Sequence, residues 1–166
     1  MRGNPSLYGI SVVVVDDNDT TRAMLRGILR QEGAEVVGEA KDGLTALAIC
    51  RKLTPRLVCL DVMMPGVSGV DVLRDIRTEM PETRVLMVTG STERQVVQAS
   101  IEGGASGYVV KPFNAARVIA AVQQAFSRAP APVQPASAAA SAATEASPAA
   151  EDEAAEDSAA GDTASS

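Results

Sequence analysis

The chain has 166 residues, enough for one ordinary domain with a hydrophobic core, and it contains no histidine, which excludes imidazole metal sites, Ser/His catalysis and phosphohistidine. The net charge is −6, but seven of the 21 acidic residues lie after residue 128, which leaves 14 acidic against 15 basic residues before it. A folded part so close to neutral does not resemble a nucleic-acid-binding domain, so we expect no nucleic-acid partner.

Five apolar stretches with the pattern of buried strands alternate with five amphipathic helices. The expected strands are 10–15, 35–40, 57–61, 84–88 and 107–110, and the expected helices are about 20–32, 44–53, 70–80, 92–102 and 115–128. Short connections and right-handed crossovers then predict an α/β fold, a doubly wound parallel sheet with helices on both faces.

Apolar spacing also predicts which helix faces are buried. In the first helix the expected stripe is Met24, Leu25, Ile28 and Leu29, and in the second it is Leu44, Leu47, Cys50 and Leu53. The two cysteines, Cys50 and Cys59, lie in no CxxC or Cys/His pattern, which indicates buried, reduced thiols of a cytoplasmic protein. The N-terminus shows no signal-peptide pattern and no apolar run has transmembrane length, so we expect no membrane insertion.

The composition changes sharply near Arg128. Residues 129–166 are mainly Ala, Ser, Pro and acidic residues, and Val133 is their one large aliphatic residue. Such a segment buries too little apolar surface to offset its ordering entropy, so we expect a domain over 1–128 and a disordered tail over 129–166. Nothing in the tail has the pattern of a DNA-binding or enzymatic module, so we expect no second functional domain in that segment.

Three of the expected strands end in charged residues: Asp16 and Asp17 after the first strand, Asp61 at the end of the third, and Lys111 after the fifth. A carboxylate at the end of a buried strand is costly unless an opposite charge meets it. The carboxyl ends of parallel strands meet in one crevice, where ligands of such folds bind. The sequence therefore predicts a site of three carboxylates and one lysine.

These strand ends resemble the receiver domain of two-component response regulators, over roughly residues 10–126. The matching residues are Asp16-Asp17, Asp61 followed by Met64-Pro65-Gly66, Thr89, and Lys111-Pro112-Phe113. The run 104–113 is especially similar to the CheY-like single-domain regulators of chemotaxis. The resemblance implies a flavodoxin-like sheet with strand order 2-1-3-4-5.

The resemblance also implies a set of residue roles. Asp61 would be the phosphoacceptor and Lys111 and Thr89 would contact the phosphoryl group, while Mg²⁺ would be held by Asp16, Asp17, Asp61 and the backbone carbonyl of Met63. The Lys111–Pro112 bond would be cis. Thr89 and Tyr108 would form a switch that reshapes the face made by the fourth helix, fifth strand and fifth helix.

Simpler interpretations exist for single residues. Asp16 and Asp17 taken alone could be helix-capping acids, Thr89 could cap the next helix, and Tyr108 could be a core aromatic. Two positions near the site depart from the polar pattern of the chemotaxis proteins: Met63 is apolar, and Ser91 has a short side chain. Because Met63 cannot hydrogen-bond an attacking water, we expect a longer-lived acyl phosphate.

The function expected from these features is a phosphorylation-activated switch that takes phosphate from a sensor histidine kinase and binds a downstream protein. The similarity to chemotaxis regulators suggests a chemotaxis or motility pathway. We expect a monomer or weak dimer that catalyses only its own phosphoryl transfer and dephosphorylation. The alternatives are a phosphorelay intermediate that passes phosphate to a histidine phosphotransfer protein, and a phosphate-independent adaptor. A haloacid-dehalogenase-type phosphatase fits poorly, because Met63 stands where that family has a second acid.

Overall fold

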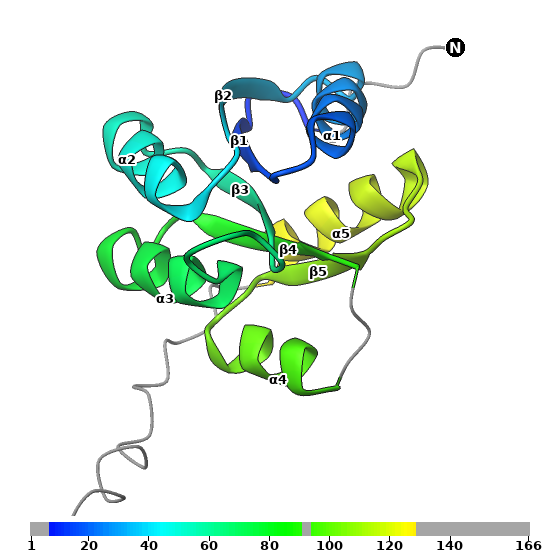
Figure 1. The fold of residues 1–166 in the computed structure, drawn as a ribbon. Coiled ribbons are helices and arrows are strands. Elements are labelled where there is room, and N and C mark those ends of the chain that lie inside the picture. Colours follow the sequence, from blue (N-terminus) through cyan, green and yellow to red (C-terminus); the bar gives the residue numbers. More distant parts are fainter. Residues whose placement is uncertain (1–6, 91–93, 129–166) are drawn as a thin grey trace, which may run out of the picture. The chain divides into compact units, whose positions relative to one another are not determined.

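A computed structural model describes residues 7–90 and 94–128 of the chain. The strands are β1 (Ser11–Val15), β2 (Glu35–Ala40), β3 (Leu57–Asp61), β4 (Arg84–Thr89) and β5 (Gly107–Val110). The helices are α1 (Asp19–Gln31), α2 (Gly43–Leu53), α3 (Gly69–Glu79), α4 (Arg94–Glu102) and α5 (Ala115–Ser127) (Figure 1). The predicted tail, Ser91 and the predicted first two residues of the fourth helix lie outside the described residues.

The strands form one parallel sheet in the order β2-β1-β3-β4-β5, which confirms the predicted fold class and strand order. Each predicted strand is present to within one residue at either end. Within the described ranges, no helix is both long enough and apolar enough to cross a lipid bilayer.

Alternating side chains of the strands supply two cores, one on each face of the sheet. On one face Val12 and Val14 pack with α1 and α5, and on the other Val13 and Val15 pack with α2 and α3. Figure 1 shows α1 and α5 on one side of the sheet and α2, α3 and α4 on the other. Because helices cover both faces of the sheet, polar residues can gather at the ends of the strands.

The predicted buried faces of the first two helices are partly wrong. Met24 is 49% exposed and Leu44 is 69% exposed, whereas small residues of α2, including Gly43 and Ala46, are buried. Gly43 lies so close to α3 that a Cβ there would come within 2.6 Å of Val72. The close approach of α2 to its neighbours, and not the size of its leucines, therefore sets which face is buried. Leu53, at the end of α2, is also 39% exposed.

Both cysteines are free and buried, as predicted. Burial raises the pKa of Cys50 to about 11 and that of Cys59 to about 12. Neither thiol is therefore a nucleophile at neutral pH.

The first residue of α3, Gly69, packs directly against the end of β3. A Cβ on Gly69 would lie 2.0 Å from the backbone oxygen of Asp61 and 2.8 Å from the Cα of Val62. The Gly69 N–H also donates a hydrogen bond to the Val62 carbonyl, at 3.1 Å. The backbone of the strand that carries Asp61 is thus held by a contact that no larger residue allows.

We expect Gly69→Ala to lower the free energy of unfolding by at least about 2 kcal/mol, because the clash is with backbone that cannot turn aside. The matched control is Gly27→Ala in α1, where a Cβ would meet nothing within 4 Å. That change should stabilise the chain by about 0.5–1 kcal/mol through helix propensity. Urea unfolding of both variants tests this, and equal stabilities would contradict the role given to Gly69.

Candidate functional site

The charged residues predicted to meet at the strand ends do lie together. The Lys111 ammonium, just after β5, is 2.7 Å from Asp16 Oδ2 and 3.1 Å from Asp61 Oδ2. Asp16 directly follows β1, and Asp61 is the last residue of β3. The neighbouring positions of β1 and β3 in the sheet bring the two carboxylates side by side, and Lys111 bridges them.

Asp16 is completely buried and held at several atoms. Its backbone N–H donates to the Ala40 carbonyl at 3.1 Å, which extends the pairing of β1 with β2 by one residue. Its Oδ1 accepts a hydrogen bond of 2.8 Å from the Asn18 backbone, and its Oδ2 accepts the bond from Lys111. Asp16 is therefore part of the framework of the site as well as a possible ligand.

Asp61 is 2% exposed, and its Oδ1 accepts a hydrogen bond of 3.2 Å from the Met63 backbone. Burial raises the pKa of the Asp61 carboxyl above its ordinary value; the hydrogen bond and charge of Lys111 oppose this rise, and the Asp16 carboxylate adds to it. The ionised form of Asp61 is thus held in the folded protein at a cost, which a cation would offset.

Lys111 shows the reverse balance. Burial alone would lower the pKa of its ammonium, but the hydrogen bonds to Asp16 and Asp61 and their charges outweigh that effect, so the pKa is raised. Lys111 is consequently a fixed positive charge at neutral pH. One ammonium nevertheless faces more than one carboxylate.

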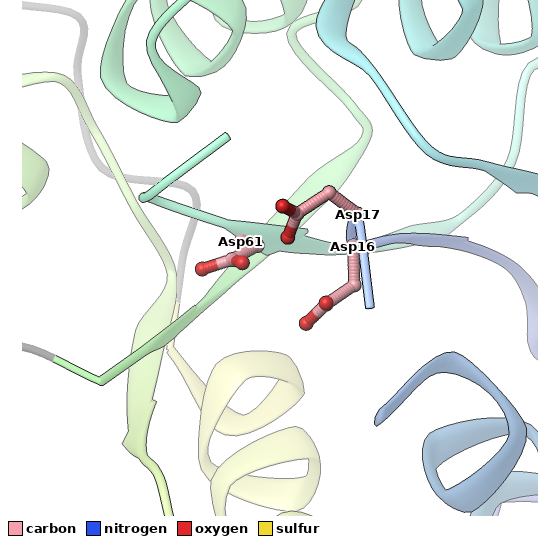
Figure 2. Close-up of side chains that lie close together, drawn as sticks. All are labelled: Asp16, Asp17 and Asp61. Atoms are coloured by element: carbon pink, nitrogen blue, oxygen red, sulfur yellow. The ribbon is translucent and has the colours of Figure 1, made fainter. Parts of the chain in front are cut away.

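Asp17 completes the acidic group. A carboxylate oxygen from each of Asp16, Asp17 and Asp61 lies within 4.8 Å of the others (Figure 2). Asp17 is exposed, and in the described part of the chain no hydrogen bond or ion pair holds its side chain. Three carboxylates against one ammonium leave excess negative charge, and oxygen donors of this kind fit Mg²⁺, which commonly keeps several of its waters.

Thr89 and Tyr108 lie on the two neighbouring strands that complete this edge. Thr89 is the last residue of β4 and 2% exposed, and its carbonyl accepts a hydrogen bond of 2.7 Å from the Lys111 N–H. Tyr108 lies in β5, three residues before Lys111, and is 51% exposed. The interpretation of Tyr108 as a core aromatic is therefore wrong, and its role as a switch stays a prediction.

Two loop features complete the picture. Met63 is 64% exposed beside Asp61, and the use of its carbonyl as a metal ligand stays a prediction. The Lys111–Pro112 peptide bond is cis, as the resemblance implies. Asn18 is the N-cap of α1 and accepts from the Thr21 N–H, so α1 is capped by Asn18 and not by either acid of the pair.

Arg22 also contacts the site, although the sequence patterns above did not predict it. Its Nη1 donates a hydrogen bond of 2.8 Å to the Asp16 backbone carbonyl, and its guanidinium also pairs with Asp19 and Glu39. A signal was available, because side chains in the first turn of a helix point back toward its N-terminus. An arginine at that place in α1 can therefore reach the loop that carries the two acids.

Comparison with known proteins agrees with this geometry. The response regulator receiver domain model matches residues 12–123. Chemotaxis protein CheY-3 of Vibrio cholerae is 36% identical over 121 residues, which cover 72% of this chain and 93% of that protein. The receiver domain of NarL from Mycobacterium tuberculosis superposes with a TM-score of 0.69 at 32% identity, covering 73% of this chain and 99% of the other. The CheX–CheY–BeF3–Mg²⁺ complex of Borrelia burgdorferi gives a TM-score of 0.72 at 27% identity, covering 75% and 98%.

We expect Asp61→Asn to stabilise the chain in EDTA at neutral pH, by about 1 kcal/mol, because it removes a buried charge that folding disfavours. The raised pKa sets the sign: the ionised carboxyl costs stability at neutral pH, and protonation relieves that cost. The gain should therefore shrink as the pH falls toward the ordinary range of an aspartate pKa.

Thermal unfolding of both proteins in EDTA between pH 4.5 and 7.5 would measure the effect. Asp71→Asn is the control, since Asp71 is an exposed residue in the first turn of α3. A loss of stability in Asp61→Asn would mean that the Lys111 bond outweighs the burial of the charge.

Proposed function

The chain belongs to the response regulator receiver domain family, and from this we propose that it is a signalling switch turned on by phosphorylation of Asp61. Receiver domains are signalling proteins of two-component systems. The observation that carries the proposal is the bridge of Lys111 between Asp16 and Asp61, with the Asp17 carboxylate beside them. A buried carboxylate with a fixed ammonium next to it suits nucleophilic attack on an anionic phosphoryl group.

The transfer we propose starts from a phosphohistidine of a sensor kinase. One Asp61 carboxylate oxygen forms a bond to phosphorus and the bond from phosphorus to the donor nitrogen breaks. The donor ring, protonated by solvent on its other nitrogen, leaves as neutral imidazole. The product is an acyl phosphate on Asp61. Lys111 Nζ pairs with a phosphoryl oxygen in place of a carboxylate, and the Thr89 hydroxyl donates to another.

Asp16, Asp17, Asp61 and the Met63 carbonyl would hold Mg²⁺. When bound, this ion supplies positive charge that offsets the carboxylates and the incoming phosphoryl oxygens. Support comes from the acidic cluster itself and from the Borrelia burgdorferi relative, whose complex includes CheY, BeF3 and Mg²⁺.

We place the output of the switch on the face formed by α4, β5 and α5. A groove of about 700 Å³ lies there, and its lining includes Ile101, Tyr108, Ala121 and Arg117. Ile101 and Tyr108 are both more than half exposed. In the proposed active state Thr89 moves toward the phosphoryl group and Tyr108 turns inward, so the groove differs between the two states and can select a partner.

The proposed partner is a downstream protein, and similarity to chemotaxis proteins favours a chemotaxis-type pathway. Three arginines and no acidic residue are among the described residues that line the groove, which suits a segment with apolar and acidic side chains. A cytoplasmic location fits the two free, buried thiols. We propose that the protein is a monomer or a weak dimer. The alternative role is a phosphorelay intermediate, which would pass its phosphate onward to a histidine phosphotransfer protein.

Incubation with Mg²⁺ and acetyl phosphate should add one phosphoryl group to the chain, visible by intact-mass spectrometry. Asp61→Asn should show no adduct, because it lacks the nucleophile, and Asp71→Asn should react as the unchanged chain does. No adduct from acetyl phosphate or from a phosphorylated histidine kinase would contradict the proposal and favour a phosphate-independent adaptor.

Met63→Asn should shorten the lifetime of the phosphorylated protein, by roughly tenfold. Met63 is exposed beside Asp61, and an amide there could orient the attacking water, which a thioether cannot do. The control is Met24→Asn, an exposed methionine on α1. Mass spectrometry would measure the rate at which each phosphorylated protein loses its phosphate. Equal rates for all three proteins would contradict this role of Met63.

A further inference from the structure

The loop between β1 and α1 carries two of the three acids, but it holds them very differently. The Asp16 side chain is buried and fixed by Asn18 and Lys111. The Asp17 side chain is exposed, and no described residue contacts it through a hydrogen bond or ion pair. The direction of the Asp17 carboxylate therefore depends on the backbone of the loop.

Arg22, in the first turn of α1, forms a hydrogen bond with that backbone. Its Nη1 donates to the Asp16 carbonyl at 2.8 Å, and its side chain is only 16% exposed. On its other side the guanidinium pairs with Asp19 in α1, and its Nε lies 3.7 Å from Glu39 Oε2 in β2. One rigid, planar group thus connects the loop to the helix that follows it and to the neighbouring strand.

The Asp16 carbonyl belongs to the peptide unit that joins Asp16 to Asp17. Because that unit is planar, holding its oxygen also fixes the direction of the Asp17 N–Cα bond. The Asp17 side chain then leaves the backbone in a defined direction, toward the other two carboxylates (Figure 2).

We propose that Arg22 is a positioning residue for the cation site, acting on Asp17 through the Asp16–Asp17 peptide. The inference rests on the proposed binding of Mg²⁺ by the acidic cluster. The ion pairs of Arg22 with Glu39 and with Asp19, which is 90% exposed, contribute little to stability by themselves. The contact with the loop carbonyl is what distinguishes Arg22 from an ordinary surface arginine.

A pure charge effect and a positioning effect have opposite signs. If Arg22 acted on Mg²⁺ through its charge alone, removing that charge would relieve repulsion and tighten metal binding. If Arg22 positions Asp17, removing the guanidinium must weaken metal binding although a positive charge is lost. The direction of the change therefore decides between the two.

The chain offers a matched control in Arg26. Its Nη1 pairs with the same Glu39, at 2.8 Å, from the next turn of α1, and its side chain is 41% exposed. Among the described residues, Arg26 forms its hydrogen bond and ion pair with Glu39 and not with the loop. Arg26→Gln thus removes an arginine and a Glu39 ion pair from the same surface while leaving the Asp16 carbonyl bound.

The experiment is a Mg²⁺ titration of the full chain followed by ¹H–¹⁵N NMR. The amides of Asn18 and Met63 report on the site, because they donate to Asp16 and Asp61. Arg22→Gln should raise the Mg²⁺ dissociation constant roughly tenfold, as loss of an outer-sphere support typically does. Arg26→Gln should bind as the unchanged chain does, and Asp17→Asn marks the loss when a ligand itself is changed.

Arg22→Lys keeps the charge but lacks the planar fork, and it should fall between the unchanged chain and Arg22→Gln. It also carries the test if Arg22→Gln does not fold, which thermal unfolding of each variant would reveal. A second readout is the Mg²⁺ dependence of labelling by acetyl phosphate. Excess Mg²⁺ should restore the maximum rate in Arg22→Gln, since the nucleophile and Lys111 are intact.

Equal or tighter Mg²⁺ binding by a folded Arg22→Gln, or by Arg22→Lys where the glutamine variant does not fold, would overturn the positioning role and leave the proposed cation site standing. An equal loss in Arg26→Gln would likewise overturn it, because the effect would then come from Glu39. No Mg²⁺ binding by the unchanged chain would overturn the cation site itself and this inference with it.

Discussion

The contact of one ammonium with two buried carboxylates is the interaction on which the site depends. Lys111 meets Asp16 and Asp61 at the carboxyl ends of the strands, where both acidic residues are buried. Without that partner, two adjacent negative charges in a poorly solvated place would be strongly disfavoured. With it, the ionised form of Asp61 is favoured against its burial, and the three carboxylates retain negative charge that a divalent cation can offset.

The fold supplies this contact by topology, and close packing then holds it in place. Because the strands are parallel, their carboxyl ends bring the three residues together, although Lys111 is 95 positions from Asp16 along the chain. The approach of Gly69 to the Asp61 carbonyl and the grip of Arg22 on the Asp16 carbonyl hold the two acid-bearing strand ends from outside. Both features involve backbone oxygens: a Cβ on Gly69 would clash with the Asp61 carbonyl, and Arg22 donates a hydrogen bond to the Asp16 carbonyl.

Strand β5 connects the charged site to the groove beside α4 and α5. β5 carries Tyr108 in the groove beside α4 and α5, and Lys111 follows two residues after Val109, which is buried in the core. The Lys111 N–H is bonded to the Thr89 carbonyl at the end of β4. If Lys111 and Thr89 change their contacts, the effect can reach the groove through β5, because Lys111 directly follows β5 and its N–H is bonded to the Thr89 carbonyl. This is the physical basis of the proposed switch.

The sequence by itself determined the class of fold and the composition of the site. Apolar runs alternating with amphipathic helices predicted the sheet, and charged residues at the strand ends predicted which side chains meet, because both follow from local patterns. Only the tertiary structure decided that Lys111 bridges both acids, that Leu44 is exposed while Ala46 is buried, and that Arg22 holds the Asp16 carbonyl. These depend on distances between elements and on how closely α2 and α3 approach, and no local pattern encodes such through-space contacts.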